Sequence, residues 1–88
     1  MFRLWGKIIK DTRLTKDTVI YDQDYTKSRT EMIFNSLTAI CNYFDLAEPL
    51  WLDSNIRSFK KHHKTRFYKD NFIEEINFDF LEIEILEE

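Results

Sequence analysis

Hydrophobic and polar side chains alternate along the first ten residues of the chain. Phe2, Leu4 and Ile8 fall on one side of an extended backbone, with basic residues between them. Period-two alternation is typical of a β-strand with one buried face. The pattern, although imperfect at Trp5 and Ile9, predicts a strand over residues 2–10.

A second strand is predicted over residues 14–21, where Thr18 and Ile20 share one face. The polar stretch 10–13 that precedes it is short, so the two strands are expected to form a β-hairpin. Gly6 lies inside the first strand, which predicts a bulge or the close approach of another segment there.

A helix is predicted to follow the hairpin. Ser28 and Glu31 fit a capping box, in which the hydroxyl accepts from the Glu31 amide and the carboxylate reaches back. The apolar positions then recur every three to four residues as far as Asp45, as on one side of a helix; they are Ile33, Leu37, Ile40, Cys41 and Phe44.

Pro49 ends this helix, and a shorter second helix is predicted to start with Asp53 as its N-cap. It runs to about His62, with Ile56 and Phe59 facing inward. The following residues 64–72 show no clear period and stay ambiguous.

The C-terminal stretch alternates again. Between residues 78 and 86, Leu81, Ile83 and Ile85 lie on one side and acidic residues on the other. This pattern predicts a strand with one wet face, and the main alternative is a helix over residues 79–87.

The order β-β-α-α-β predicts the α+β class, with a small three-stranded antiparallel sheet and two helices packed on one face. With 88 residues the chain is long enough for a single domain, expected to span residues 1–88. A high aromatic content, 16%, provides the bulk that so small a core requires.

Cys41 is the only cysteine, which excludes an internal disulfide. The N-terminus lacks the long apolar region of a signal peptide. No apolar run approaches the ~20 residues that span a bilayer. We therefore expect residence in the reducing cytoplasm and no membrane association.

Charge is distributed unevenly along the chain. Residues 70–88 carry eight acids and no base (−8), and the remainder carries thirteen bases and eight acids (+5), which together give the net charge of −3. The basic segment 57–69 contains candidate anion-binding residues that could pair with phosphates; they are Arg57, Lys60, Lys61, Lys64 and Arg66.

Two other interpretations of the basic segment stay open. It is either a solvated surface or it lies against the acidic C-terminal strand, which would neutralise it. The overall acidity also disfavours nucleic acid as a partner, because nucleic-acid-binding domains are usually basic.

Catalytic and cofactor motifs are missing. The chain has a single Gly and therefore no Gly-rich phosphate loop, and neither His62 nor His63 has the companions of a zinc motif. Glu82 and Glu84 would share one face of a strand, but a hydrated face, or one set against Lys and Arg, explains them better than acid catalysis. We expect no cofactor, no metal and no enzymatic activity.

Aromatic and aliphatic residues also occupy the second face of the predicted hairpin, away from the helices. They are a candidate protein interface, and a homodimer or another protein would cover them; the residues are Trp5, Ile9, Val19 and Tyr21. The leading interpretation is a small interaction protein that binds another protein or itself through this face or a strand edge.

Several segments resemble a family of small uncharacterised proteins of similar length from anaerobic Gram-positive bacteria. The resemblance implies a bacterial cytoplasmic protein and supplies no activity, cofactor or site residue. The segments that carry it are Trp5-Gly6-Lys7, Phe44-Asp45-Leu46, the run from Pro49 to Ile56, the run from Lys64 to Tyr68, the run from Asp70 to Glu74, and the run from Phe78 to Ile83.

Overall fold

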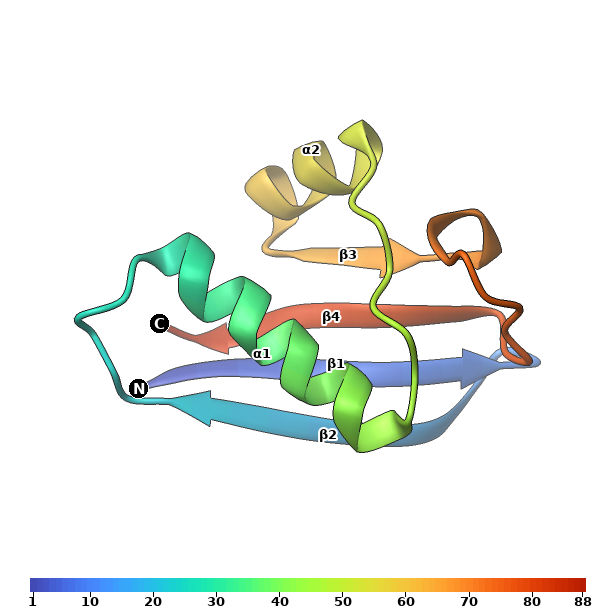
Figure 1. Ribbon diagram of the computed structural model, residues 1–88, viewed down its shortest axis with the longest axis horizontal. Coiled ribbons are helices and arrows are strands. Elements are labelled where there is room, and N and C mark those ends of the chain that lie inside the picture. The colour runs from blue at the N-terminus through green and yellow to red at the C-terminus, as the bar shows by residue number, and fades with distance from the viewer.

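The computed structural model describes residues 1–88 and shows an α+β protein with two helices and one antiparallel sheet (Figure 1). The four strands are arranged in the order β2-β1-β4-β3, so the C-terminal strand lies inside the sheet. The elements are β1 (Phe2–Lys10), β2 (Arg13–Asp22), α1 (Arg29–Phe44), α2 (Asp53–His62), β3 (Lys64–Phe67), the 3-10 turn η1 (Lys69–Asn71) and β4 (Phe80–Glu87).

The sheet has four strands, and the sequence-based expectation of three is wrong. The strand that was missed, β3, lies within the stretch that showed no clear period. It is only four residues long and buries just Thr65 and Phe67, so its alternation is too brief to recognise. The predicted C-terminal strand is confirmed: β4 pairs with β1 on one side and β3 on the other, which excludes the helical alternative.

The predicted hairpin of β1 and β2 is confirmed. Its turn residues Asp11 and Thr12 both have positive φ, 54° and 64°, as the tight turns that suit twisted hairpins require. Gly6 marks a close approach, because a Cβ added there would lie 2.6 Å from Cγ2 of Ile40 in α1. The irregularity in the hairpin register lies elsewhere, between Ile8 and Ile9.

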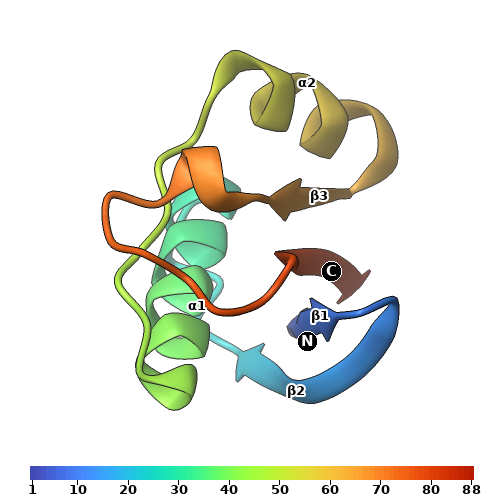
Figure 2. The same cartoon turned by 90° about the vertical axis from the view of Figure 1, so that its right-hand side faces the viewer.

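Helix α1 has both of its predicted ends. The Ser28 hydroxyl accepts from the Glu31 amide at 3.1 Å, and Asp45 ends the helix in a left-handed conformation. The buried stripe of α1 packs on β1 and β2, and Figure 2 shows the helix covering one face of the sheet.

Helix α2 differs from its prediction in two respects. Its N-cap is Leu52, one residue earlier than expected, and the Leu52 amide donates to Oδ1 of Asn55. Ile56 is 41% exposed, so its predicted inward position is wrong, whereas Phe59 is buried as predicted. The helix packs along β3 at one edge of the sheet (Figure 2), and it buries the polar Asn55 against that strand.

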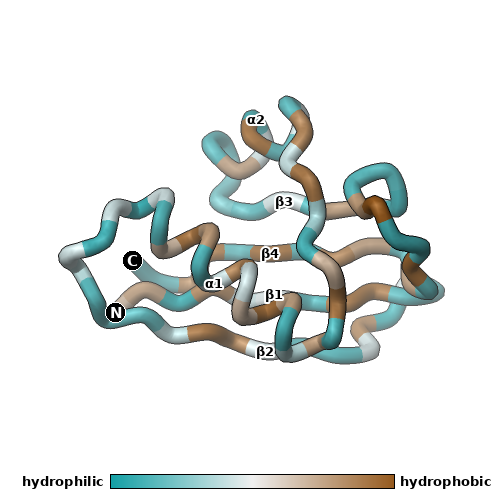
Figure 3. The backbone as a smooth tube through the Cα atoms, in the orientation of Figure 1, coloured by the Kyte–Doolittle hydropathy of each residue, from teal (hydrophilic) through white to brown (hydrophobic).

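One hydrophobic core joins the sheet to both helices. Trp51, in the linker between the helices, makes edge-to-face contacts with Phe59 of α2 and Phe67 of β3. Figure 3 shows hydrophobic stretches in α1, in the middle of β2 and along β4. The fully or nearly fully buried apolar residues are Phe2, Leu4, Ile8, Met32, Ile33, Leu37, Ile40, Cys41, Phe59, Phe67, Phe72, Leu81 and Ile83.

The contact between Gly6 and Ile40 provides a test of the packing of α1 on the sheet. We expect Gly6→Ala to lower the free energy of unfolding by about 1–3 kcal/mol, the usual cost of overpacking a core. Urea denaturation measures the change. Combined with Ile40→Ala, which removes the contacting atoms, the alanine at position 6 should cost far less; equal costs in both backgrounds would contradict the contact.

Candidate protein-binding face

The face of the sheet opposite α1, called here the open face, has no helix over it. Alternate β1 residues from Arg3 to Ile9 point to this side and are only partly buried. Trp5 lies directly opposite Val19 in the register. Tyr21, two residues after Val19 on β2, lies diagonally across from Trp5 and is 59% exposed. These three predicted interface residues therefore form one contiguous group.

Ile9, the fourth predicted interface residue, lies further along the same face. Lys7 separates it from Trp5, and at ~3.3 Å per residue the two positions are about 13 Å apart. Its register partners are Leu14 on β2 and Phe80 on β4, and Phe80 contacts Tyr68 with ring centroids 5.3 Å apart. The open face thus has an apolar group at each end.

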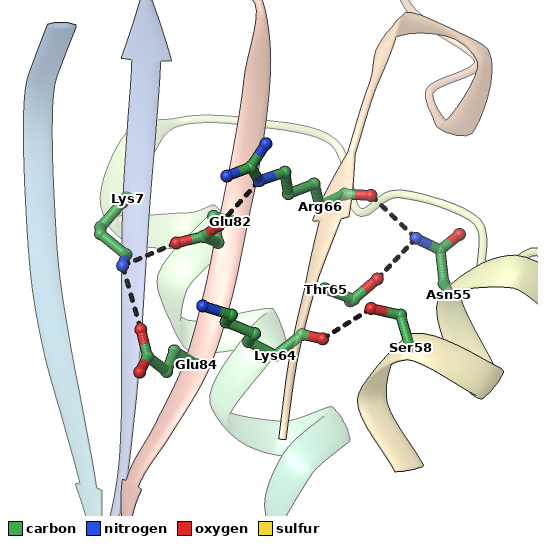
Figure 4. A network of polar contacts seen from close by, with 8 residues as sticks. All are labelled: Lys7, Asn55, Ser58, Lys64, Thr65, Arg66, Glu82 and Glu84. Atoms are coloured by element: carbon green, nitrogen blue, oxygen red, sulfur yellow. Dashed lines mark hydrogen bonds and ion pairs between the residues drawn. The ribbon is translucent and has the colours of Figure 1, made fainter. Parts of the chain in front are cut away.

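A ladder of charges crosses the open face between these groups (Figure 4). Lys7 Nζ lies 2.7 Å from Glu82 and 3.1 Å from Glu84, and Arg66 Nε lies 2.8 Å from the other oxygen of Glu82. Lys7 also lies over the ring of Trp5, 3.9 Å from its centroid. The ladder joins β1, β4 and β3 through side chains as well as through the backbone.

The ladder sets the protonation of its members. Burial by itself would raise the pKa of Glu82, which is 8% exposed, but hydrogen bonds from Lys7 and Arg66 outweigh it and hold the pKa below its ordinary value. Burial would likewise lower the pKa of Lys7, yet its hydrogen bonds to Glu82 and Glu84 raise the pKa above its ordinary value. Both groups are charged at neutral pH, as an ion pair requires.

The outer edge of β3 is occupied by side chains of α2 (Figure 4). Asn55 Nδ2 donates to the backbone oxygen of Arg66 at 2.8 Å, and the Ser58 hydroxyl donates to the backbone oxygen of Lys64 at 2.9 Å. Asn55 is held in turn by Asn71, which donates to its Oδ1 at 2.7 Å. These contacts satisfy edge acceptors that would otherwise offer themselves to another strand.

The outer edge of β2 has no such cover, because β2 pairs only with β1. Successive residues of an antiparallel strand direct their backbone groups to alternate sides. The backbone oxygen of Ile9 accepts from the Asp79 amide on the β4 side. Gly6 and Leu4, like the other even-numbered residues of β1, therefore direct their backbone N–H and C=O groups toward β2. Their register partners on β2 are Thr18 and Ile20.

It follows that Asp17, Val19 and Tyr21 direct their backbone N–H and C=O groups to the free edge of β2. The side chains of the same three residues lie on the open face, where the Asp17 carboxylate accepts from Nε1 of Trp5 at 2.9 Å. The free edge and the exposed ring of Tyr21 therefore form one continuous surface.

The structure divides the candidate anion-binding residues between two elements. Arg57, Lys60 and Lys61 are exposed on α2, whereas Lys64 and Arg66 lie on the open face of β3. Because β3 pairs with β4, the basic and acidic segments lie side by side, and Arg66 is paired with Glu82. The sequence had left open whether these segments meet.

The remaining candidate groups lie apart from the open face. The Cys41 thiol is buried in α1, where burial, with a smaller effect of Glu48, raises its pKa to about 12. His62 and His63 are exposed at the end of α2, and His63 ends the helix in a left-handed conformation. No three His, Cys, Asp or Glu side chains gather into a metal-binding group.

Comparison with known proteins identifies no relative of this chain. No protein-family model, curated protein or solved structure matches the chain. The resemblance to small proteins of anaerobic Gram-positive bacteria therefore stays a prediction. Neither helix of the structure has the length and apolar character needed to cross a membrane.

The charge ladder predicts a specific loss of stability in acid. A carboxyl group whose pKa is lowered by folding stabilises the folded state above its unfolded pKa, and this contribution disappears as the pH falls through the folded pKa. We expect Glu82→Gln to be less stable than the parent at pH 7 and to lose less stability than the parent between pH 5 and pH 3.

Urea midpoints measured across this range provide the readout. Glu75→Gln is the matched control, because Glu75 is exposed and has no ion pair. If the parent and Glu82→Gln lost the same stability between pH 5 and pH 3, the ladder would not stabilise the fold.

Proposed function

We propose that this protein is a small non-enzymatic interaction protein that binds another protein, or a second copy of itself, along the free edge of β2 and the adjacent open face. One observation carries the proposal: the two edges of the sheet differ in whether other groups bind their backbone atoms. The edge of β3 is satisfied by Asn55 and Ser58, whereas the longer β2 edge offers unpaired backbone groups.

An extended partner segment would add a fifth strand next to β2, a recurring mode of peptide recognition. Backbone hydrogen bonds to Asp17, Val19 and Tyr21 would provide affinity. The exposed ring of Tyr21 and the half-buried Val19 would provide selectivity for a partner side chain on the open face, since aromatic residues commonly anchor interfaces.

A proline at position 19 tests the free edge. Val19→Pro removes an N–H that points outward, so β2 keeps its pairing with β1, as edge strands tolerate proline on their solvent side. We expect this variant to fold, as judged by circular dichroism, and to associate more weakly than the parent in sedimentation and pull-down experiments at micromolar concentration.

Thr18→Pro is the matched control, because its N–H points to β1 and its loss should destabilise the sheet. Association that is as strong in a folded Val19→Pro variant as in the parent would contradict the proposal. So would a parent chain that stays monomeric and captures no partner.

A second candidate function, the binding of nucleic acid or another anion, is supported by a polar groove between α2 and β3. The groove has a volume of about 340 Å³, and Lys64, Arg66 and His62 line it together with the hydroxyls of Ser58 and Tyr68. The ion pair between Arg66 and Glu82 weakens this candidate, because it already neutralises one of the cations.

Salt dependence distinguishes the two functions. Phosphate binding through several Lys and Arg side chains releases counterions, so its affinity falls steeply as salt rises. If the anion-binding function is correct, a fluorescent single-stranded oligonucleotide should bind at low salt and lose at least about tenfold in affinity between 50 and 200 mM salt.

Lys64→Glu should weaken that binding, because Lys64 lines the groove, whereas Lys10→Glu, which is not in the groove, should not. No binding at low salt would eliminate nucleic acid as the partner.

A further inference from the structure

A second unpartnered surface lies between α1 and α2, remote from β2. It is a groove of about 230 Å³ with an apolar floor that includes Ile33, Phe34 and Trp51. Arg29 and Lys60 stand at its rim, and no acidic residue lines it. The groove is therefore apolar inside and has two cations at its border, one of which, Arg29, is paired with Glu88.

Large apolar side chains are unusually exposed around this groove. Phe34 is 47% exposed although it makes an edge-to-face contact with Trp51, and Ile56 is 41% exposed. Leu52, the N-cap of α2, adds another exposed apolar side chain beside Trp51. Clustered apolar exposure of this kind marks interaction sites.

The size and charge of the groove specify its occupant. Its volume lies below the ~300–1,000 Å³ of small-molecule sites, so it fits one or two side chains of a protein segment. The rim favours a segment in which carboxylates flank the apolar side chain. The ion pair between Arg29 and Glu88 shows that the rim accepts a carboxylate.

The chain itself contains a segment of this chemistry. Ile73, in the loop between η1 and β4, is 85% exposed, the highest value among its large hydrophobic residues. It is flanked by Asp70 on one side and by Glu74 and Glu75 on the other. An isoleucine displayed between three acids is complementary to an apolar groove between two cations.

The two surfaces cannot meet within one molecule. Figure 1 shows the first turn of α1, which contributes Arg29 to the groove, at one end of the long axis, and the loop that precedes β4 at the other end. That axis is 37 Å long. We infer that the groove between α1 and α2 receives Ile73 and its flanking carboxylates from a second copy of this chain.

The contact is head-to-tail, because the donor loop and the acceptor groove are different surfaces. Each bound pair leaves one loop and one groove free, so association continues into rings or chains of copies. The carboxylates of the occupant would compete with Glu88 for Arg29. Salt screens such solvent-exposed ion pairs but not the apolar contact of Ile73, so raised salt weakens the association only in part.

Two variants that are each blocked on one side provide the decisive test. Ile73→Ser removes the donor side chain, and Ile56→Ser with Lys60→Glu blocks the acceptor groove. All three residues are exposed, so the folds should survive, which thermal melts verify. We expect the parent to show a mass that rises with concentration in sedimentation equilibrium, and each variant alone to associate at least about tenfold more weakly.

Mixed in equal amounts, the two variants should form a one-to-one complex through this contact and extend it no further, because only one functional loop and one functional groove meet. A mixture that behaves as the sum of its components would overturn the inference. So would parent-like association by both variants, or a parent that stays monomeric at every concentration.

Repeating the mixture with Val19→Pro in both chains separates this contact from the β2 edge. Complex formation that persists in this background supports the groove independently of the proposed function, and loss of the complex in folded chains assigns the association to β2 instead.

Discussion

The insertion of β4 between β1 and β3 is the constraint on which the structure depends. Without β4, the N-terminal hairpin and the α2–β3 unit would share no backbone hydrogen bonds. This central position buries Glu82, and a buried carboxylate is costly unless it is paired. Lys7 from one neighbouring strand and Arg66 from the other provide the pairs. The charge ladder therefore follows from the topology, and it links the two strands that β4 separates.

Most of the fold is readable from the sequence, because long elements repeat their pattern several times. The alternation in β1 and β4 and the capped apolar stripe of α1 each contain enough periods to identify the element. β3 contains too few. The sequence pattern placed Ile56 inward, but the α2 residue that faces the protein interior there is Asn55, which is polar. Asn55 binds the backbone of β3. A buried asparagine has no hydrophobic signal, so its role emerges only when its hydrogen-bond partners, including Asn71, are placed in space.

The candidate site was predicted only in part, for a related reason. Period-two alternation places Trp5, Val19 and Tyr21 on the face away from the helices, and the register brings them together. Sequence patterns do not reveal which strand edge is covered. That property depends on two side chains of α2 that reach backbone oxygens of a strand following it in the chain. The meeting of the basic and acidic segments was foreseen as one of several alternatives, and pairing between β3 and β4 brings it about.

The place of β4 in the chain also has a consequence for biosynthesis. Once β2 has followed β1 out of the ribosome, β1 has one edge paired to β2 and the other awaiting residues 80–87. At ~5–20 residues per second, roughly 4–14 s separate the synthesis of Lys10 from that of Phe80. During this interval the nascent hairpin exposes an apolar strand on its unpaired side. Until β4 docks, the unpaired edge of β1 is open to non-native strand pairing.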